Sequence, residues 1–229
     1  MSPSRSSLVL IAACSIGCAS AREEPTENNN GPMDAAMSSG SDARLVDAQS
    51  LDASGSSTSP DSGPSSGCAF TGVLATWTFT NEAGNQASTA AGSSATGVTA
   101  TAVQRSAGLT PVSGANSINS SSWPTAATAD ATKYYTFSVT PPVSCMLAIT
   151  TLEIDAKASG TGPATASAGT SIDAFAQKTT LSTSAPGTIT LNTNPTTNAV
   201  EVRVYGYSAG AAGGTLRLQT ALTINGSLQ

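Results

Sequence analysis

Apolar and polar residues alternate along most of the chain beyond residue 72, in short runs separated by clusters of Gly, Pro, Asn and Ser. Alternation with a period of two is typical of β-strands that bury one face. We expect strands in VLATWTFT (73–80), KYYTFSVT (133–140), MLAITTLEIDAK (146–157), NAVEVRVYGY (198–207) and TLRLQTALTING (215–226). The residues predicted to face inward are Val73, Ala75, Trp77, Phe79, Tyr135, Phe137, Val139, Leu147, Ile149, Leu152, Ile154, Val200, Val202, Val204, Leu216, Leu218, Leu222 and Ile224.

The third of these runs changes phase in its middle. Leu147 and Ile149 alternate in one phase and Leu152 and Ile154 in the other, which predicts a β-bulge at residues 150–151. No window here has the apolar spacing and end signals of an amphipathic helix. Many short strands separated by turns predict a sandwich or a barrel, and we expect an all-β fold, a single antiparallel β-sandwich of jelly-roll type.

The N-terminus has the layout of a secretory signal peptide over residues 1–17. Arg5 precedes an apolar run, residues 8–13, that is too short to span a bilayer. The segment also resembles a bacterial lipoprotein signal, in which an aliphatic residue and two small residues precede a lipidated cysteine. Cys14 in IAAC fits that pattern, and Cys18 in SIGC fits it less well but lies at a more usual distance, so we favour Cys18. Cleavage without lipid attachment is the alternative.

Residues 18–67 differ in composition from the rest of the chain, being rich in Ser, Asp, Gly and Pro without periodicity. Such a segment buries too little apolar surface to offset its ordering entropy, so we expect a disordered tether. Eight of the 14 acidic residues precede Cys68, and six acidic and six basic residues follow. The folded domain predicted over 68–229 is therefore neutral, which argues against nucleic-acid binding.

Cysteine and histidine usage limits the chemistry further. The chain has no histidine, which excludes Ser-His and Cys-His nucleophilic sites and His-containing metal sites. Cys68 and Cys145 lie in the predicted domain, and an exported protein meets an oxidising compartment. We predict a disulfide between them, worth roughly 4 kcal/mol in the chain-entropy model.

Several segments that occur together and in order suggest a family. The segments SGTGP, SIDAF, EVRVYGYSA and GGTLRLQTALTINGS resemble the last strands of a galactose-binding-like β-sandwich found in exported bacterial proteins, including many with a PEP-CTERM sorting tail. The resemblance covers about residues 72–228. The chain departs from the pattern at its end, Gln229, where no sorting tail follows, and in its two added cysteines. The resemblance implies a fold and an extracytoplasmic setting, and no established activity.

The candidate ligand-binding residues are aromatic and planar polar side chains. Arg203, Tyr205 and Tyr207 share the polar side of one strand, and Trp123 lies in the loop NSSSWPT. Exposed rings beside planar polar groups are what sugar binding requires. The alternative is that the tyrosines only cover the sheet and that Trp123 plugs an end of the sandwich.

Carboxylates offer weaker candidates. Glu153 and Asp155 share one strand face and would need Glu201 on a neighbouring strand to form a glycosidase-like site; a solvated, charge-balanced sheet face is the alternative. Asp130 and Asp173 lie in or near loops where a structural calcium ion is conceivable, although Asp173 more often caps a turn. No other cofactor or metal is predicted.

One glycine pair resembles a phosphate loop at first sight. In SGTGP, Gly160 and Gly162 are followed by Pro163, without a third glycine in register, a P-loop lysine or a helix. We therefore expect a loop between two strands, with glycines that permit a left-handed turn.

The sequence as a whole predicts a non-enzymatic protein that is lipid-anchored to the cell envelope or otherwise secreted. Surface binding or adhesion is the expected role, with polysaccharide or another surface protein as partner and with membrane contact through the N-terminal lipid only. A carbohydrate-binding module is the alternative, and a glycan hydrolase a more distant one.

Overall fold

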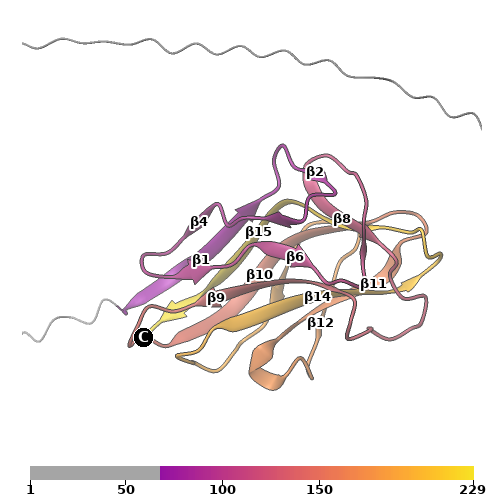
Figure 1. Ribbon diagram of the computed structural model, residues 1–229. Coiled ribbons are helices and arrows are strands. Elements are labelled where there is room, and N and C mark those ends of the chain that lie inside the picture. The colour runs from indigo at the N-terminus through magenta and orange to yellow at the C-terminus, as the bar shows by residue number, and fades with distance from the viewer. Residues whose placement is uncertain (1–67) are drawn as a thin grey trace, which may run out of the picture. The chain divides into compact units, whose positions relative to one another are not determined.

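The computed structural model describes residues 68–229. The predicted signal peptide, the lipidated cysteine (Cys18 or Cys14) and the predicted tether lie outside the described residues. Two β-sheets pack face to face (Figure 1), and the chain passes back and forth between them. The predicted fold class, an antiparallel β-sandwich of jelly-roll type, is confirmed.

The first sheet, sheet A, contains eight strands. Its main order is β13 (Gly187–Thr190), β10 (Leu147–Ala158), β15 (Leu216–Leu228), β1 (Phe70–Thr78) and β4 (Ser93–Ser94). β8 (Ser117–Ser121) pairs with the first part of β15, and also with β7 (Thr110–Pro111) and, in parallel, with β2 (Ala83–Gly84). β15 is thus the central strand that joins both halves of the sheet.

The second sheet, sheet B, contains seven strands. Its order is β12 (Thr179–Leu181), β11 (Pro163–Thr170), β14 (Val200–Ala209), β9 (Tyr134–Thr140), β6 (Val103–Arg105) and β3 (Ser88–Thr89), and β5 (Thr99–Ala100) also pairs with β9. The helical content of the described residues is one 3-10 turn, η1 (Ser171–Asp173). No helix in residues 68–229 is long and apolar enough to cross a membrane.

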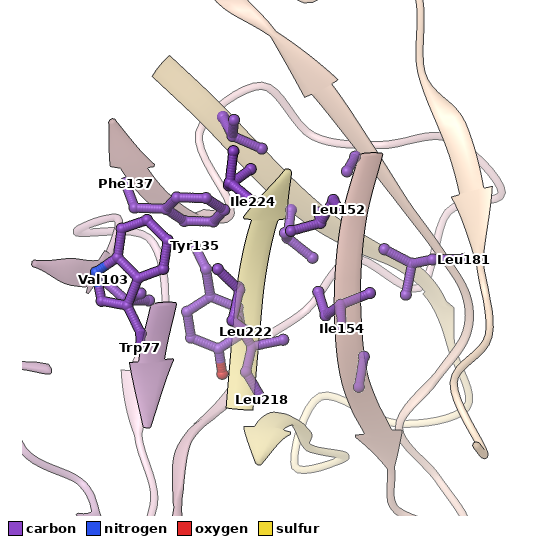
Figure 2. Packing of buried hydrophobic residues seen from close by; sticks show 14 of the residues in the cluster. Trp77, Val103, Tyr135, Phe137, Leu152, Ile154, Leu181, Leu218, Leu222 and Ile224 are labelled. Carbon is purple, nitrogen blue, oxygen red and sulfur yellow. The ribbon is translucent and has the colours of Figure 1, made fainter. Parts of the chain in front are cut away.

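Aromatic and aliphatic side chains from both sheets fill the space between them (Figure 2). The Trp77 and Phe137 rings pack with centroids 4.9 Å apart, and both side chains are inaccessible to solvent or nearly so. Polar atoms in this core find partners: Trp77 Nε1 donates to the Thr101 carbonyl at 2.8 Å, and the Tyr135 hydroxyl donates to the Leu216 carbonyl at 2.6 Å. Burial of each such large side chain contributes roughly 2–3 kcal/mol.

The inward-facing positions follow the predicted alternation in β9, β10, β14 and β15. The predicted bulge in β10 is confirmed, because the pairing with β15 shifts register between Ile149 and Thr151. The prediction for Val73 is wrong: its side chain is 46% exposed and Leu74 is buried instead. A register shift between Val73 and Ala75 in β1 reverses the phase at this point.

The predicted disulfide is confirmed between Cys68 and Cys145, whose Cα atoms are 5.4 Å apart. It joins the start of the described chain to the loop between β9 and β10. Phe70 pairs with Leu228, so β1 begins where β15 ends, at the same end of the sandwich (Figure 1). The disulfide therefore closes the end of the domain at which the preceding segment enters.

The SGTGP segment is a loop between β10 and β11, as expected. The expected left-handed turn is wrong, since neither Gly160 nor Gly162 has a positive φ. Gly162 is required for a different reason: a Cβ atom there would lie 2.2 Å from the Thr215 carbonyl oxygen. The glycine allows this loop to pack against the chain entering β15.

Candidate functional site

The outer face of sheet B carries the polar residues of β14. Strand alternation directs Val202 and Val204 into the core and Glu201, Arg203 and Tyr205 outward. The register with β9 sets their neighbours, because Arg203 lies opposite Thr136 and Tyr205 opposite Tyr134. Residues distant in sequence thus meet on one sheet face.

The Arg203 guanidinium packs against two aromatic rings. Its central carbon is 4.0 Å from the Phe175 ring centroid and 4.2 Å from the Tyr134 ring centroid. Its Nε donates to Glu201 Oε1 at 2.7 Å. Burial lowers the pKa of Arg203, but its hydrogen bonds with Glu201 and Tyr205, together with the charge of Glu201, outweigh burial and place that pKa above its ordinary value. The guanidinium is therefore a fixed cation.

Phe175 reaches Arg203 because the segment after β11 folds over the sheet. Asp173 Oδ2 accepts a hydrogen bond from the Gln177 backbone N–H at 2.7 Å, which closes a turn after η1. Ala174 and Phe175 both have left-handed backbones, with φ of 55° and 61°, a conformation that costs energy for residues other than glycine. Gly169 leaves room beneath, since a Cβ there would lie 2.8 Å from the Gln177 carbonyl oxygen.

A small pocket of about 160 Å³ lies beside this arrangement. Its floor and walls combine two cations, two aromatic rings and three methyl groups. The lining residues are Ala129, Ala131, Ala174, Phe175, Lys178, Arg203 and Tyr205. Three segments that are separate in sequence, the loop before β9, the turn after η1 and strand β14, therefore build one cationic pocket.

Lys178 contributes the second cation of the pocket. Its Nζ lies 5.3 Å from the Tyr205 ring centroid and donates to the Phe175 carbonyl at 2.5 Å. Within residues 68–229, no carboxylate lies within salt-bridge distance of Lys178. The charge of Lys178 is consequently held at the pocket without an acidic partner in the described part of the chain.

A second hollow of sheet B, the sheet B groove, is lined in part by Glu201, the partner of Arg203. It has a volume of about 480 Å³, and its lining combines hydroxyl, amide and carboxylate groups with the apolar surface of Ala102, Phe137 and Ala199. Thr136 donates to Glu201 Oε1 at 2.8 Å, so the Glu201–Arg203 pair separates the groove from the cationic pocket. The polar lining residues are Thr101, Gln104, Thr136, Ser138, Ser171 and Glu201.

Three of the predicted binding residues, Arg203, Tyr205 and Tyr207, belong to β14, but the two tyrosines do not offer freely exposed rings. Tyr205 is 2% exposed, because Tyr134 packs against it edge-on at 5.8 Å and Lys178 lies over its ring. Burial raises the pKa of Tyr205, and the neighbouring Arg203 offsets only part of that rise. Tyr207 is half-buried, opposite Thr165 of β11, and does not line the pocket.

Trp123 does not present its ring to solvent, contrary to its selection as a binding residue. It is 2% exposed, packs edge-on against Tyr135 at 5.4 Å, and donates from Nε1 to the Ser120 carbonyl at 2.8 Å. Gly206 provides the space, since a Cβ there would lie 3.1 Å from the Trp123 ring. The alternative interpretation, packing at an end of the sandwich, describes this residue.

The three carboxylates considered for hydrolysis do not converge. Glu153 and Asp155 belong to β10 in sheet A, whereas Glu201 belongs to β14 in sheet B. Asp155 is 8% exposed and accepts hydrogen bonds from Gln219 and Thr220 at a second bulge of β10 that the sequence did not predict. The Glu153–Asp155–Glu201 constellation is therefore ruled out by topology.

The two residues considered for calcium binding, Asp130 and Asp173, each accept hydrogen bonds that stabilise a local turn. Asp130 accepts hydrogen bonds from the Thr132 backbone and hydroxyl at 2.8 and 2.7 Å, and these bonds lower the pKa of Asp130. Asp173 closes the turn described above, as the alternative interpretation predicted. No group of three His, Cys, Asp or Glu side chains comes together within the described range.

Sequence reasoning missed Tyr134, Phe175 and Lys178 as members of the site. Tyr134 is detectable from alternation, since it faces opposite to Tyr135. Phe175 and Lys178 lie in a loop without periodicity, so only the fold brings them to Arg203. A scan against family models finds no match to the chain, and comparisons with curated proteins and with solved structures find none either.

Proposed function

We propose that residues 68–229 form a non-catalytic binding domain of an exported protein, and that it binds polysaccharide on the outer face of sheet B. The observation that carries this proposal is the position of the Glu201–Arg203 pair between the sheet B groove and the cationic pocket. Among the described residues, Arg203 hydrogen-bonds the Glu201 carboxylate through Nε and also the Tyr205 hydroxyl, and its terminal amino groups Nη1 and Nη2 have no carboxylate or carbonyl acceptor. These donors are pre-positioned for a ligand at the centre of the face.

The shape and chemistry of the groove favour a polysaccharide. Sugars are recognised by planar polar groups that bind adjacent hydroxyls, and Gln104, Glu201 and Arg203 supply such groups on one face. A volume of about 480 Å³ lies within the usual range for small-ligand sites. An open sheet face also lets a chain extend beyond one sugar unit.

Export and anchoring belong to the same proposal. The signal-like N-terminus, the lipoprotein-type Cys18 or Cys14 and the Cys68–Cys145 disulfide all suit an oxidising, extracytoplasmic setting. We propose that the domain is displayed on an acidic tether and is related to the galactose-binding-like sandwiches that its C-terminal segments resemble. Mass spectrometry of the mature N-terminus tests the anchor, because lipidation and simple cleavage give different masses.

The binding test uses affinity electrophoresis of the full-length protein in gels that contain neutral or charged polysaccharides. Ser138→Trp fills the groove of sheet B, and Thr223→Trp places the same bulk on the outer face of sheet A, beside Glu153 and Asp155. We expect retardation that Ser138→Trp abolishes and Thr223→Trp leaves intact. The reverse result moves the site to sheet A, and no retardation in any gel rejects polysaccharide binding.

Adhesion through another surface protein is the second candidate. It is favoured by Val143, which is 96% exposed beside the disulfide, with Phe70, Val73 and Met146 also exposed. A concentration-dependent self-association that Val143→Ser removes would support this role.

A further inference from the structure

The aromatic rings of the site are already covered by cations. The Arg203 guanidinium occupies one face each of Phe175 and Tyr134, and Lys178 lies over Tyr205. Sugar rings bind aromatic side chains by stacking on exposed ring faces. Stacking on these particular faces would require the cations to leave, so recognition at this site must use charge and hydrogen bonds instead.

The pocket carries an excess of positive charge. Glu201 pairs with the Nε of Arg203, and Lys178 has no acidic partner in residues 68–229. The nearest acidic residues along the chain, Asp130 and Asp173, use their carboxylates on Thr132 and Gln177 and do not line the pocket. One uncompensated positive charge therefore remains at a guanidinium whose Nη1 and Nη2 have no carboxylate or carbonyl acceptor in residues 68–229.

The guanidinium is prepared for a planar anion. The fork of an arginine matches a carboxylate through two parallel hydrogen bonds, and the contacts with Phe175 and Tyr134 limit the orientations of the Arg203 guanidinium. A fixed side chain loses less rotamer entropy when it binds. The pocket, about 160 Å³, is smaller than a site for a whole small ligand and suits a single functional group of a larger one.

We propose that the ligand is an acidic polysaccharide, and that a sugar carboxylate binds in the pocket between Arg203 and Lys178. This rests on the proposed polysaccharide-binding function and specifies its ligand class. The chain of sugar units would lie in the sheet B groove, with one carboxylate directed past Glu201 into the pocket. Lys178 adds a point charge, and the methyl groups of Ala129, Ala131 and Ala174 limit competing hydration.

The test compares four polymers in titration calorimetry with the full-length protein: polygalacturonate, alginate, methyl-esterified polygalacturonate and dextran sulfate. We expect binding to a carboxylated polymer and a loss of about tenfold or more on esterification, since one charge-assisted interaction is removed. Dextran sulfate distinguishes a general anion site from a carboxylate site, because it supplies tetrahedral anions. Binding of dextran sulfate as tight as that of both carboxylated polymers overturns the assignment to carboxylate.

Variants locate the interaction. Arg203→Lys keeps the charge but loses the fork, and should weaken binding about tenfold; Lys178→Gln should weaken it less while leaving the Arg203 stack in place. Arg217→Gln removes one positive charge from the outer face of sheet A and is the matched control, expected to bind like the parent. Equal losses in Lys178→Gln and Arg217→Gln, each of which removes one positive charge, would mean non-specific charge attraction and overturn the site.

Two outcomes separate the inference from the function on which it rests. If esterified and free polygalacturonate bind equally and Ser138→Trp abolishes both, the polysaccharide site stands and the carboxylate assignment fails. If no polymer binds and all variants unfold like the parent, both proposals fail. Thermal unfolding of Arg203→Lys is measured alongside, and if that variant is unfolded, Lys178→Gln alone decides between the outcomes.

Discussion

The Arg203 guanidinium and the centroid of the Phe175 ring lie 4.0 Å apart, although one belongs to β14 and the other to the turn after η1. Through this contact the sheet and the turn fix each other. The turn holds Phe175 in a left-handed backbone, and the ring in turn limits the orientations of the guanidinium. The shape of the proposed site therefore depends on a loop that is not itself a strand.

We predict that Phe175→Ala loosens the segment over residues 171–178. The change removes one face of the cation–aromatic stack, worth about 1 kcal/mol at a partly exposed site. Hydrogen exchange should accelerate at the Phe175 and Gln177 amides, which donate to Thr170 and Asp173 respectively. The β9 amides should remain protected, because the core does not involve Phe175.

The control for this prediction is Ile172→Ala. Ile172 lies in the same turn but is exposed and does not line the pocket. Truncation there should leave exchange at Gln177 unchanged. Faster exchange in both variants alike would mean that the Phe175–Arg203 contact does not hold the turn.

The sequence predicted much of the sandwich because a strand that buries one face alternates apolar and polar residues with a period of two, and this alternation is the record that the sequence keeps of the fold. Tyr135, Phe137 and Val139 are buried as that record indicates. It fails where the backbone departs from regular pairing, as at Val73 and Leu74. A bulge depends on the partner strand, and the partner of β1 is the last strand of the chain.

The site was predictable only in part. Arg203 and Tyr205 follow from alternation in β14, and the sequence selected both. Trp123 was selected for its loop position, yet the missing side chain at Gly206 lets its ring enter the core. Phe175 carries no periodic signal, because its place is set by the turn, by Gly169 and by the register between β11 and β14.

The disulfide should contribute a large share of the stability. Replacing Cys68 and Cys145 together by serine removes the cross-link between two positions 77 residues apart. We expect the free energy of unfolding to fall by about 4 kcal/mol. Urea denaturation of both proteins measures it. The unchanged protein under reducing conditions should show a similar loss, and a loss below about 1 kcal/mol in both would contradict the prediction.

Arg105 has a structural role that the sequence did not reveal. Its guanidinium donates to the Gln86, Gly84 and Asn119 carbonyls and to the Ser120 hydroxyl, with no carboxylate partner in residues 68–229. Burial lowers the pKa of Arg105, although not enough to remove its charge near neutral pH. It joins the segment after β2 to β8.

Arg105→Lys should therefore lower the free energy of unfolding by about 2 kcal/mol, because a lysine cannot reach all four acceptors and leaves part-buried carbonyls unpaired. Arg217→Lys is the control. Arg217 is also half-buried, but it makes no hydrogen bond to a carbonyl of residues 68–229. The free energy of unfolding should therefore change by no more than about 0.5 kcal/mol. Thermal unfolding measures both. Equal stability of the two variants would argue against the role of Arg105.

Tyr135 should make the domain sensitive to alkali. Burial raises the pKa of Tyr135 above its ordinary value of about 10, and its hydroxyl donates to the Leu216 carbonyl. Above about pH 10 the unfolded chain releases this proton and the folded protein retains it, so alkali favours unfolding by up to about 1.4 kcal/mol per pH unit. Below that pH the contribution is fully present.

Tyr135→Phe isolates the effect from the other groups that titrate in alkali. At neutral pH the variant should be less stable by about 1 kcal/mol, because the Leu216 carbonyl loses its donor. Since a phenylalanine cannot ionise, its stability should fall less steeply above pH 10, and the two curves of unfolding free energy against pH should converge and then cross. Parallel curves would show that the Tyr135 hydroxyl ionises as readily in the folded protein as in the unfolded chain. That result would contradict the prediction, because a buried hydroxyl should be harder to ionise.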